Sequence, residues 1–384
     1  MLDSDSIING SKVRLCLDCG KCTVVCPVAR YDTEFNPRLI VQDALKRNCG
    51  TPINEKVWSC IGCNMCVERC NYNVDFTDFI RFLRHKGWED GDDIQYSHSG
   101  ILQSAMRLMA RKDTRQNRLN WLPDDIRVDN ETDVAFFVGC APYYDIQFSD
   151  LDVATTETTK DALRLLNLGQ TPFKLLPNER CCGRDLLLLG DFDGFMALAQ
   201  ANIQSFHEKG IRKIITNCPE CLYTLKVDYP RFLDDWDIQV EHLYEAIAPL
   251  IEANKIKLGH LNKKVTFHDP CTLGRYLNIY DQPRNIIESV EGLEILEMAD
   301  TRAKALCCGA SPWANCGFVN KQIQKERLSQ AGDTGADVLI TACPKCKIHL
   351  RCAQKNLLSD NVCQIEIQDL ASLLIQSLSP QEAK

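Results

Sequence analysis

Two stretches decide the fold of most of this chain: residues 211–221, Ile-Arg-Lys-Ile-Ile-Thr-Asn-Cys-Pro-Glu-Cys, and residues 337–346, Asp-Val-Leu-Ile-Thr-Ala-Cys-Pro-Lys-Cys. Each is a β-rich run that leads directly into Cys-Pro-x-Cys. Proline suits the first turn of a helix, where no backbone hydrogen bond is lost. The free N–H groups of such a turn also stabilise thiolates. In both stretches we therefore predict a strand followed by a helix that begins at a redox-active or metal-binding pair of cysteines.

The features around these stretches occur twice in the same order, so the chain from about residue 131 onward is a tandem repeat. Each half opens with a β-rich run that ends in a cysteine, at residues 134–140 and 265–271. Each continues with Cys-Cys-Gly, a helical stretch closed by glycine, the strand and Cys-Pro-x-Cys, and a weaker strand with a terminal helix. Such alternation predicts two related α/β units with parallel sheets, whose sites lie at the carboxyl edges of the strands.

Five cysteines recur in each half. They are Cys140, Cys181, Cys182, Cys218 and Cys221, and then Cys271, Cys307, Cys308, Cys343 and Cys346. Adjacent cysteines do not easily bind one metal ion, because their side chains diverge, but both can bind a larger cluster. Five thiolates also exceed what a cubane with one ligand per iron requires. We interpret each set as the ligands of an unusual iron–sulfur cluster; zinc or a dithiol pair is the alternative, and a dithiol pair leaves three cysteines of each half unexplained.

The N-terminal part carries two further cysteine runs with the spacing C-x2-C-x2-C-x3-C. They are Cys16, Cys19, Cys22 and Cys26, and then Cys60, Cys63, Cys66 and Cys70. In the bacterial two-cluster ferredoxin pattern the fourth cysteine of each run binds the other run's cluster. We expect Cys70 to complete one [4Fe–4S] cubane with the first three cysteines, and Cys26 to complete the second cubane, in an α+β ferredoxin-like module. Two zinc sites are a weaker alternative.

Composition restricts the remaining possibilities. The 384 residues include 22 cysteines and carry a net charge of −8, with no long basic run, so a nucleic-acid partner is not expected. No signal peptide and no apolar run of membrane-spanning length is evident, so we expect a cytoplasmic protein with reduced cysteines. The expected parts are the ferredoxin-type domain 1–88, a helical connector 89–130, and the α/β units 131–258 and 259–384.

The complete pattern resembles the cysteine-rich CCG family, and within it the fused D subunits of heterodisulfide reductases, which combine separate B and C subunits. The resemblance rests on the doubled C-x(n)-CCG-x(n)-C-P-x-C behind a two-cluster module, and on the run His-Asp-Pro-Cys-Thr-Leu-Gly-Arg at residues 268–275. Related members include iron–sulfur subunits of glycolate, lactate and anaerobic glycerol-3-phosphate dehydrogenases.

This resemblance implies a function. In the disulfide reductases of the family, each complete five-cysteine motif binds a noncubane [4Fe–4S] cluster, and the substrate disulfide is cleaved between the two clusters. Electrons arrive through the two cubanes from a flavin-containing, membrane cytochrome or hydrogenase-type partner, and that partner would provide any attachment to the inner face of a membrane. Members that only carry electrons often lack cysteines of one motif, whereas this chain keeps all ten.

Two other functions share the same cysteine framework. One is an electron-transfer subunit of a flavin-dependent dehydrogenase, with no substrate of its own. The other is a zinc-bound scaffold. No Rossmann G-x-G-x-x-G or P-loop motif is present, so the sequence offers no nucleotide site for the electron donor.

A few side chains outside the cysteine motifs are further candidates. His268 is a candidate proton source near Cys271, although we favour a structural role in the turn. Arg275 and Lys345 would attract an anionic substrate or simply be solvated. The remaining cysteines are interpreted as structural: Cys49, Cys316, Cys352 and Cys363. Cys316 is the one most worth examining, because it follows Cys308 by eight residues.

Overall fold

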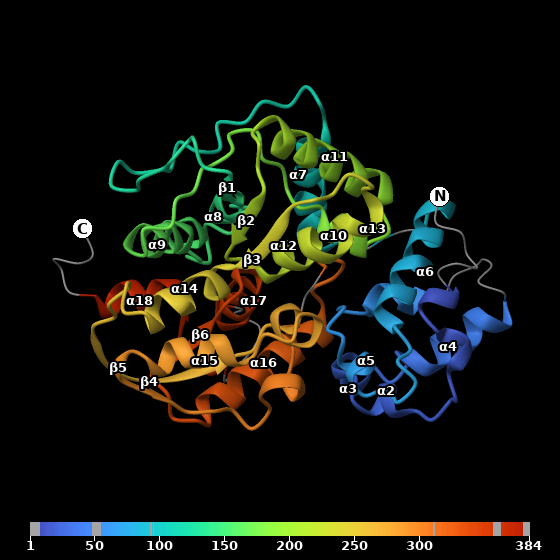
Figure 1. Cartoon of the computed structure of the whole chain (residues 1–384). Coiled ribbons are helices and arrows are strands. Elements are labelled where there is room, and N and C mark those ends of the chain that lie inside the picture. The colour runs from blue at the N-terminus through green and yellow to red at the C-terminus, as the bar shows by residue number, and fades with distance from the viewer. Residues whose placement is uncertain are drawn as a thin grey trace.

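The computed structural model describes residues 8–47, 55–92, 94, 96–309, 312–355 and 362–378. Figure 1 shows a helical N-terminal module, coloured blue, beside two α/β halves that are coloured green to yellow and yellow to red. The two halves confirm the predicted pair of α/β units, because each contains its own parallel sheet.

The N-terminal module is built from short helices and cysteine-bearing turns. Its elements are η1 (Val13–Leu15), α2 (Lys21–Val24), α3 (Pro27–Tyr31), α4 (Pro37–Lys46), η2 (Glu55–Ser59), α5 (Met65–Glu68) and α6 (Phe76–Asp90). No strand occurs among the described residues before Val134, so the α+β prediction for this module is wrong. Each cysteine run is followed by helices, so the described residues of this module form no sheet.

Local signals explain these helices. Asn36 caps α4 by accepting a hydrogen bond from the Leu39 N–H, and Pro37 occupies the first turn. Asp75 caps α6 in the same way, and Gly91 ends it in the left-handed conformation. Because α6 runs to Asp90, its last turn passes the domain boundary that we expected at residue 88.

The connector contains η3 (Ser97–Gly100) and α7 (Ile101–Ala110). Leu102, Met106 and Met109 of α7 are buried in a hydrophobic core that the connector shares with residues of both halves. The two methionines of this helix therefore serve packing.

The first half forms a three-stranded parallel sheet in the order β1-β2-β3. Its elements are β1 (Val134–Phe136), α8 (Ala141–Gln147), α9 (Thr155–Leu168), α10 (Arg184–Leu188), α11 (Phe192–Glu208), β2 (Lys213–Thr216), α12 (Pro219–Tyr223), the π-turn η4 (Thr224–Asp228), α13 (Tyr229–Phe232), β3 (Gln239–His242) and α14 (Leu243–Glu252). The predicted strand at 211–216 therefore ends, as expected, just before Cys218.

The second half forms a four-stranded parallel sheet in the order β5-β4-β6-β7. Its elements are β4 (His260–His268), the π-turn η5 (Thr272–Tyr276), α15 (Asp281–Glu288), β5 (Glu291–Ile295), η6 (Arg302–Lys304), α16 (Phe318–Gly332), β6 (Val338–Thr341), α17 (Pro344–Lys355), β7 (Glu366–Asp369) and α18 (Leu370–Ser377). The edge strand β5 was not predicted. In the first half, a single bridge between Ala135 and Lys174 takes its place.

The two halves pack reciprocally. The terminal helix α18 of the second half lies against α9 of the first, and the terminal helix α14 of the first half lies against α15 of the second (Figure 1). The short helix α12, which begins at Cys218, contacts η5, which begins after Cys271. The cysteine-bearing ends of the two sheets therefore meet at one interface.

The N-terminal module contacts both halves. Against the first half, the Arg84 guanidinium donates to the Leu188 carbonyl at 2.9 Å, and Arg81 pairs with Asp228 at 3.0 Å. Against the second half, the Arg275 Nε donates to the Cys63 carbonyl at 2.6 Å and the Tyr276 hydroxyl to the Gly62 carbonyl at 2.7 Å. The second cysteine run of the module is thus held directly against the second half.

Candidate metal centres

The eight cysteines of the N-terminal module line two cavities. One cavity, the outer module site, is lined by Cys16, Cys19, Cys22 and Cys70, and the other, the inner module site, by Cys26, Cys60, Cys63 and Cys66. The Cys66 side chain also reaches the outer cavity. The structure therefore brings together the two groups that the spacing predicts, with the fourth cysteine of each run beside the other run.

Glycines shape the turns at both module sites. Gly20 and Gly62 adopt φ values of +76° and +62°, which place the following residues around each cavity. Backbone N–H groups also approach the sulfurs: Gly62 donates to Cys60 Sγ and Val74 to Cys70 Sγ, each at 3.4 Å. The latter contact supports the run in which Asn71 stands where the first run has proline.

The inner module site suits a cluster whose iron atoms bring positive charge among the thiols. Burial, together with the neighbouring thiols, raises the pKa of Cys66 well above its usual value, and burial raises the pKa of Cys63 to about 11. Thiols packed this closely need a strong positive charge among them in order to ionise. Iron–sulfur clusters meet that need, because they are held by cysteine thiolates.

The first-half site consists of Cys140, Cys181, Cys182, Cys218 and Cys221, which line a single cavity. The Sγ atoms of Cys140 and Cys181 lie 3.2 Å apart. Cys140 and Cys218 each stand directly before a helix, α8 and α12, and Gly183 turns the chain after the cysteine pair with φ of +84°. All five sulfurs therefore converge from three different segments.

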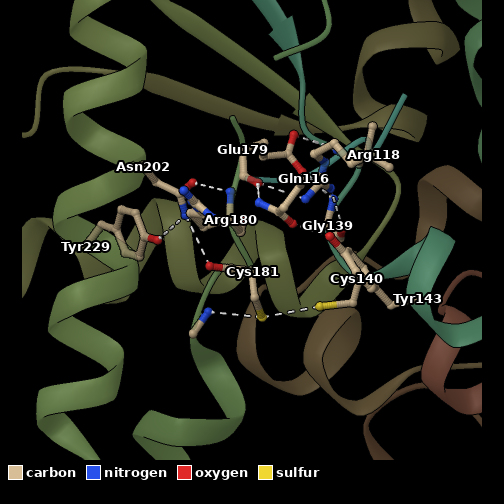
Figure 2. Close-up of polar contacts among 12 residues, drawn as sticks. Gln116, Arg118, Gly139, Cys140, Tyr143, Glu179, Arg180, Cys181, Asn202 and Tyr229 are labelled. Atoms are coloured by element: carbon tan, nitrogen blue, oxygen red, sulfur yellow. Dashed lines mark hydrogen bonds and ion pairs between the residues drawn. The ribbon is translucent and has the colours of Figure 1, made fainter. Parts of the chain in front are cut away.

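A buried polar group supports this site from behind (Figure 2). The Glu179 carboxylate accepts hydrogen bonds from the Val138 and Gly139 N–H groups at 3.1 and 2.8 Å, and pairs with Arg118 at 2.7 Å. Arg118 also donates to the Gly139 carbonyl at 2.7 Å. These contacts hold the turn that carries Cys140. Sequence reasoning missed both side chains, because Arg118 belongs to the connector and no local motif marks the pair.

The amide of Asn202 supports the Cys-Cys pair from α11. It accepts a hydrogen bond from the Arg180 N–H at 2.8 Å and donates to the Cys181 carbonyl at 3.1 Å (Figure 2). The Tyr229 hydroxyl donates to the Cys182 carbonyl at 3.2 Å. The backbone of the pair is therefore fixed, while its sulfurs remain directed into the cavity.

The second-half site consists of Cys271, Cys307, Cys308, Cys343 and Cys346, all of which are buried. Thiol contacts link Cys271 to Cys307 and Cys308 to both Cys307 and Cys346. Those hydrogen bonds, with the nearby imidazoles, hold the pKa of Cys308 well below its usual value. The five cysteines again form one contiguous group.

His268 lies in the second-half site. One of its ring nitrogens and the sulfurs of Cys308 and Cys346 lie within 4.8 Å of one another. Arg327 Nε donates to His268 Nδ1 at 3.0 Å. Burial lowers the pKa of His268, which keeps the imidazole neutral. His268 is therefore a component of the site rather than only a turn residue, and the structure places it against Cys308 and Cys346.

A buried ion pair connects the two sites. Lys345, from the second half, contacts the carboxylates of Asp185 and Glu220 in the first half, with 2.6 Å between its Nζ and the Glu220 Oε2. Burial raises the pKa of Asp185 to about 6 even though Lys345 lowers it. Of the two alternatives left open for Lys345 and Arg275, that of a solvated side chain is wrong, because only 3% and 6% of their surfaces are exposed.

Three other cysteines among the described residues stay outside the four sites. Cys316 and Cys352 lie around Lys321, whose Nζ donates to Cys352 Sγ at 3.1 Å. The Cys363 side chain lies beside Gly332. Cys49 falls outside the described residues.

A cavity of about 700 Å³ lies next to the first-half site without opening on its sulfurs. Pro142, Tyr143 and Ile146 of α8 line this cavity, whereas Ala141 and Tyr144 of the same helix face the cysteines. The helix α8 therefore separates the two spaces.

Known proteins share this arrangement. Residues 134–226 and 265–351 match the family model of the cysteine-rich CCG domain, and residues 9–71 match that of the 4Fe-4S dicluster domain. The D subunit of the dihydromethanophenazine:CoB–CoM heterodisulfide reductase of Methanosarcina mazei is 29% identical over 358 residues, which cover 90% of this chain and 82% of that protein.

Two relatives have other names. The probable iron–sulfur-binding oxidoreductase FadF of Bacillus subtilis is 28% identical over 90% of this chain and 48% of its own length. The EtfAB:quinone oxidoreductase of Syntrophomonas wolfei is 26% identical over 86% of this chain and 54% of its own length. In the described part of this chain, no helix has both the length and the apolar character to cross a bilayer. The chain therefore carries a 4Fe-4S dicluster domain followed by two CCG domains, and it belongs to the iron–sulfur proteins that are built from these cysteine-rich domains.

Proposed function

We propose that this chain is the catalytic and electron-transfer subunit of a complex that reduces a small-molecule disulfide, or forms one in the reverse direction. The outer and inner module sites would each bind a cubane [4Fe–4S] cluster. The first-half and second-half sites would each bind a noncubane [4Fe–4S] cluster through five cysteines. The observation that carries this proposal is the pair of complete five-cysteine sites, joined across one interface by Lys345.

The donor sets fit such clusters. In the first-half site, two sulfurs lie 3.2 Å apart and the adjacent Cys181 and Cys182 both enter the cavity, so one small ion cannot account for all five. Five thiolates carry more negative charge than a single zinc ion neutralises. A cluster of several irons matches both the number and the spread of the sulfurs.

Bound iron–sulfur clusters supply stepwise single-electron transfer and iron sites with affinity for sulfur. The chain's own residues provide the setting for that chemistry. Lys345, Asp185 and Glu220 close the interface between the two sites with a buried ion-pair network, which keeps bulk water out. Arg275 and Tyr276 hold the turn at Gly62 and Cys63 beside Cys271, so that the inner module site adjoins the second-half site.

The partner would be a flavin-containing, cytochrome or hydrogenase-type redox subunit. The names of relatives support this view, since one is part of a dihydromethanophenazine-dependent enzyme and another is an EtfAB:quinone oxidoreductase. We propose a cytoplasmic location, with membrane attachment only through such a partner.

Anaerobically purified protein tests the proposal. Four clusters require about sixteen irons and as much sulfide per chain, with little zinc. With reduced viologen as donor, the wild-type chain should cleave a disulfide such as the coenzyme M–coenzyme B heterodisulfide. Cys181→Ala and Cys307→Ala should abolish this activity while the cubane signals persist. Cys363→Ala, outside all four sites, is the matched control, and full activity in both site variants would refute the proposal.

A second candidate function is that of a pure electron carrier for a flavin-dependent dehydrogenase of the glycolate, lactate or glycerol-3-phosphate type. Two relatives favour testing it, because FadF and the EtfAB:quinone oxidoreductase are named as oxidoreductases and not as disulfide reductases. Protein with all four clusters that passes electrons to or from a flavoprotein but cleaves no disulfide would establish this alternative.

A further inference from the structure

The two five-cysteine sites differ at four equivalent positions. Equivalence follows from the sheets, because Val134 pairs with Lys213 in one half where Val265 pairs with Val338 in the other. Counting from these strands and from the cysteines gives the pairs Phe137 and His268, Tyr144 and Arg275, Asn202 and Arg327, and Thr224 and His349. Every member from the second half is a nitrogen base or a cation, and every member from the first half is neutral.

His268 presents a hydrogen-bond donor to the second-half site. Its Nδ1 accepts the hydrogen bond from Arg327 Nε, so in the neutral ring the proton must be on Nε2. This Nε2 is buried and has no hydrogen-bond partner of good geometry among the described residues, while the ring lies against the Cys308 sulfur. A buried N–H without a partner is costly, and an anionic cluster sulfur beside Cys308 would satisfy it.

His349 provides a second donor. Its Nδ1 lies 3.3 Å from Cys308 Sγ, and its ring packs edge-on against Trp313. Since a thiolate sulfur only accepts hydrogen bonds, the Nδ1 must be protonated when Cys308 is a thiolate. Cys308 is thus approached by two imidazoles.

Two buried guanidinium groups add positive charge. Arg327 donates to the Asp300 carbonyl, the Gln330 side chain and His268, and Arg275 donates only to backbone carbonyls. None of these acceptors is a carboxylate. The cysteines Cys63, Cys271 and Cys307 are the nearest anionic groups to Arg275. Arg327 also feels Asp269 and Asp300, without donating to either carboxylate.

The first-half site also has buried cations, but these have carboxylate partners: Arg184, which lines the cavity, pairs with Asp228 at 3.3 Å. Asn202 directs its amide to backbone carbonyls and the Tyr229 hydroxyl, and Arg118 is neutralised by Glu179. Lys345 stands between the carboxylates of Asp185 and Glu220 at the boundary of both sites, so this group does not distinguish them. The described lining of the first-half site contains no imidazole, and the arginine in that lining has a carboxylate partner.

We propose that the second-half site holds its cluster at a higher reduction potential than the first-half site does, with His268 as the hydrogen-bond donor and Arg327 as the positioning residue. This inference rests on the two noncubane clusters of the proposed function. Hydrogen bonds to sulfur and net charge are among the main determinants of cluster potential. Reduction here adds one electron and breaks no bond, so N–H donors and positive charge stabilise the reduced form.

An anaerobic redox titration followed by electron paramagnetic resonance tests the order of potentials. The wild-type protein should show two noncubane transitions, of which Cys307→Ala removes the higher and Cys181→Ala the lower. His268→Phe and Arg327→Asn install the first-half residues. Each should lower the equilibrium constant for reduction of the higher-potential cluster about tenfold, which is equivalent to lowering its reduction potential by about 59 mV for one electron. Arg327→Lys should lower the reduction potential less than Arg327→Asn does, because lysine keeps the positive charge.

The matched controls are Phe137→Leu and Asn202→Ser, which should leave the higher transition in place. The inference is overturned if Cys181→Ala removes the higher transition, or if both His268→Phe and Arg327→Asn leave it unchanged. Iron analysis separates these results from a failure of the proposed function, in which the wild-type protein would show cubane signals alone. Should Arg327→Asn not fold, His268→Phe decides the matter.

Discussion

Lys345 and Glu220 occupy the same position of the two Cys-Pro-x-Cys motifs, and their side chains form an ion pair across the interface, with 2.6 Å between Nζ and Oε2. Both residues are less than a tenth exposed. The two halves therefore use their repeated motif twice, once to present cysteines and once to join to each other. Asp185, which also contacts Lys345, follows the Cys-Cys-Gly motif of the first half by two residues.

Removal of the lysine charge should destabilise the interface. Lys345→Met leaves two buried carboxylates without their cation, and such a loss typically costs about 3–5 kcal/mol. Anaerobic urea unfolding measures the change in the free energy of unfolding. Lys257→Met, at an exposed position, should change it by less than about 0.5 kcal/mol. The triple variant with Asp185→Asn and Glu220→Gln should recover much of the loss, and a small effect of Lys345→Met alone would contradict the ion-pair argument.

A methyl group at Gly139 should damage one site selectively. Gly139 has a φ of +66°, and a Cβ there would lie 3.1 Å from Cys221 Sγ. Gly210 has a φ of +65°, but a Cβ there meets nothing within 4 Å. Both Gly→Ala variants carry a similar backbone strain of about 1–2 kcal/mol. Only Gly139→Ala should lose iron, roughly four atoms per chain if the first-half cluster is lost. Equal iron contents in the two variants would show that the close contact is harmless.

The repeated strands and the cysteine-bearing helix starts were predictable from sequence, because each depends on local signals. The run at residues 211–216 ends at Cys218, and Pro219 lies in the first turn of α12. The same holds for Pro344 in α17. In the N-terminal module Asn36 and Asp75 cap α4 and α6, whereas the ferredoxin-type cysteine spacing specifies the order of the ligands and no strand.

Contacts between distant segments could not be predicted. Arg118 and Glu179 are separated by 61 residues, and Arg275 and Cys63 by 212. A single sequence contains no signal for such pairs, because each partner alone resembles an ordinary surface charge. The different surroundings of the two five-cysteine sites have the same origin, since Arg327 and His268 come together only when α16 packs on the end of β4.

The equivalent residues His242 and Asp369, which cap α14 and α18, should give the stability a pH dependence. Burial lowers the pKa of His242 to about 3, and its Nδ1 accepts the Tyr244 N–H. The unfolded chain binds the proton near pH 6.5, so this histidine leaves stability intact above that pH and reduces it as the pH falls. From pH 7.5 to 5.5 the wild-type protein should lose roughly 1 kcal/mol more than His242→Asn, measured by urea unfolding. Asparagine preserves the cap, so identical pH profiles would contradict this account.

Asp369 should act in the opposite direction. Burial raises its pKa to about 6, while its Oδ1 accepts hydrogen bonds from the Ala371 N–H and the Tyr244 hydroxyl. Because the folded state then holds the proton more tightly than the unfolded state, stability falls as the pH rises from about 4 to 6 and stays lower above it. The free energy of unfolding of the wild-type protein should decrease by about 0.8 kcal/mol because of this residue between pH 5.5 and 7.5, and Asp369→Asn should lack that decrease. The same urea titration, run beside that of His242→Asn, should show the two variants departing from the wild-type protein with opposite slopes.

Charge on the N-terminal module should govern electron uptake. Residues 9–71 contain nine Lys and Arg against six Asp and Glu, whereas the whole chain has 44 against 52. Close in sequence to the exposed Cys19 of the outer module site, Arg14 and Lys21 are exposed, Asp18 is paired with Arg38, and Leu17 and Val24 are 62% and 83% exposed. Exposed cations and apolar side chains on the segment that carries a candidate cluster site favour a donor protein with an acidic surface. The double variant Arg14→Glu with Lys21→Glu should slow reduction by an acidic flavodoxin about tenfold at low ionic strength, and the difference should shrink in salt. Stopped-flow bleaching of the clusters measures the rate.

Two controls separate this surface from overall charge. Reduction by the small cation methyl viologen should not become slower in the double variant. A second double variant, Lys255→Glu with Lys257→Glu, lies on an exposed segment of the first half and should behave as wild type. If both double variants slow the flavodoxin reaction equally, overall charge rather than this surface controls the encounter.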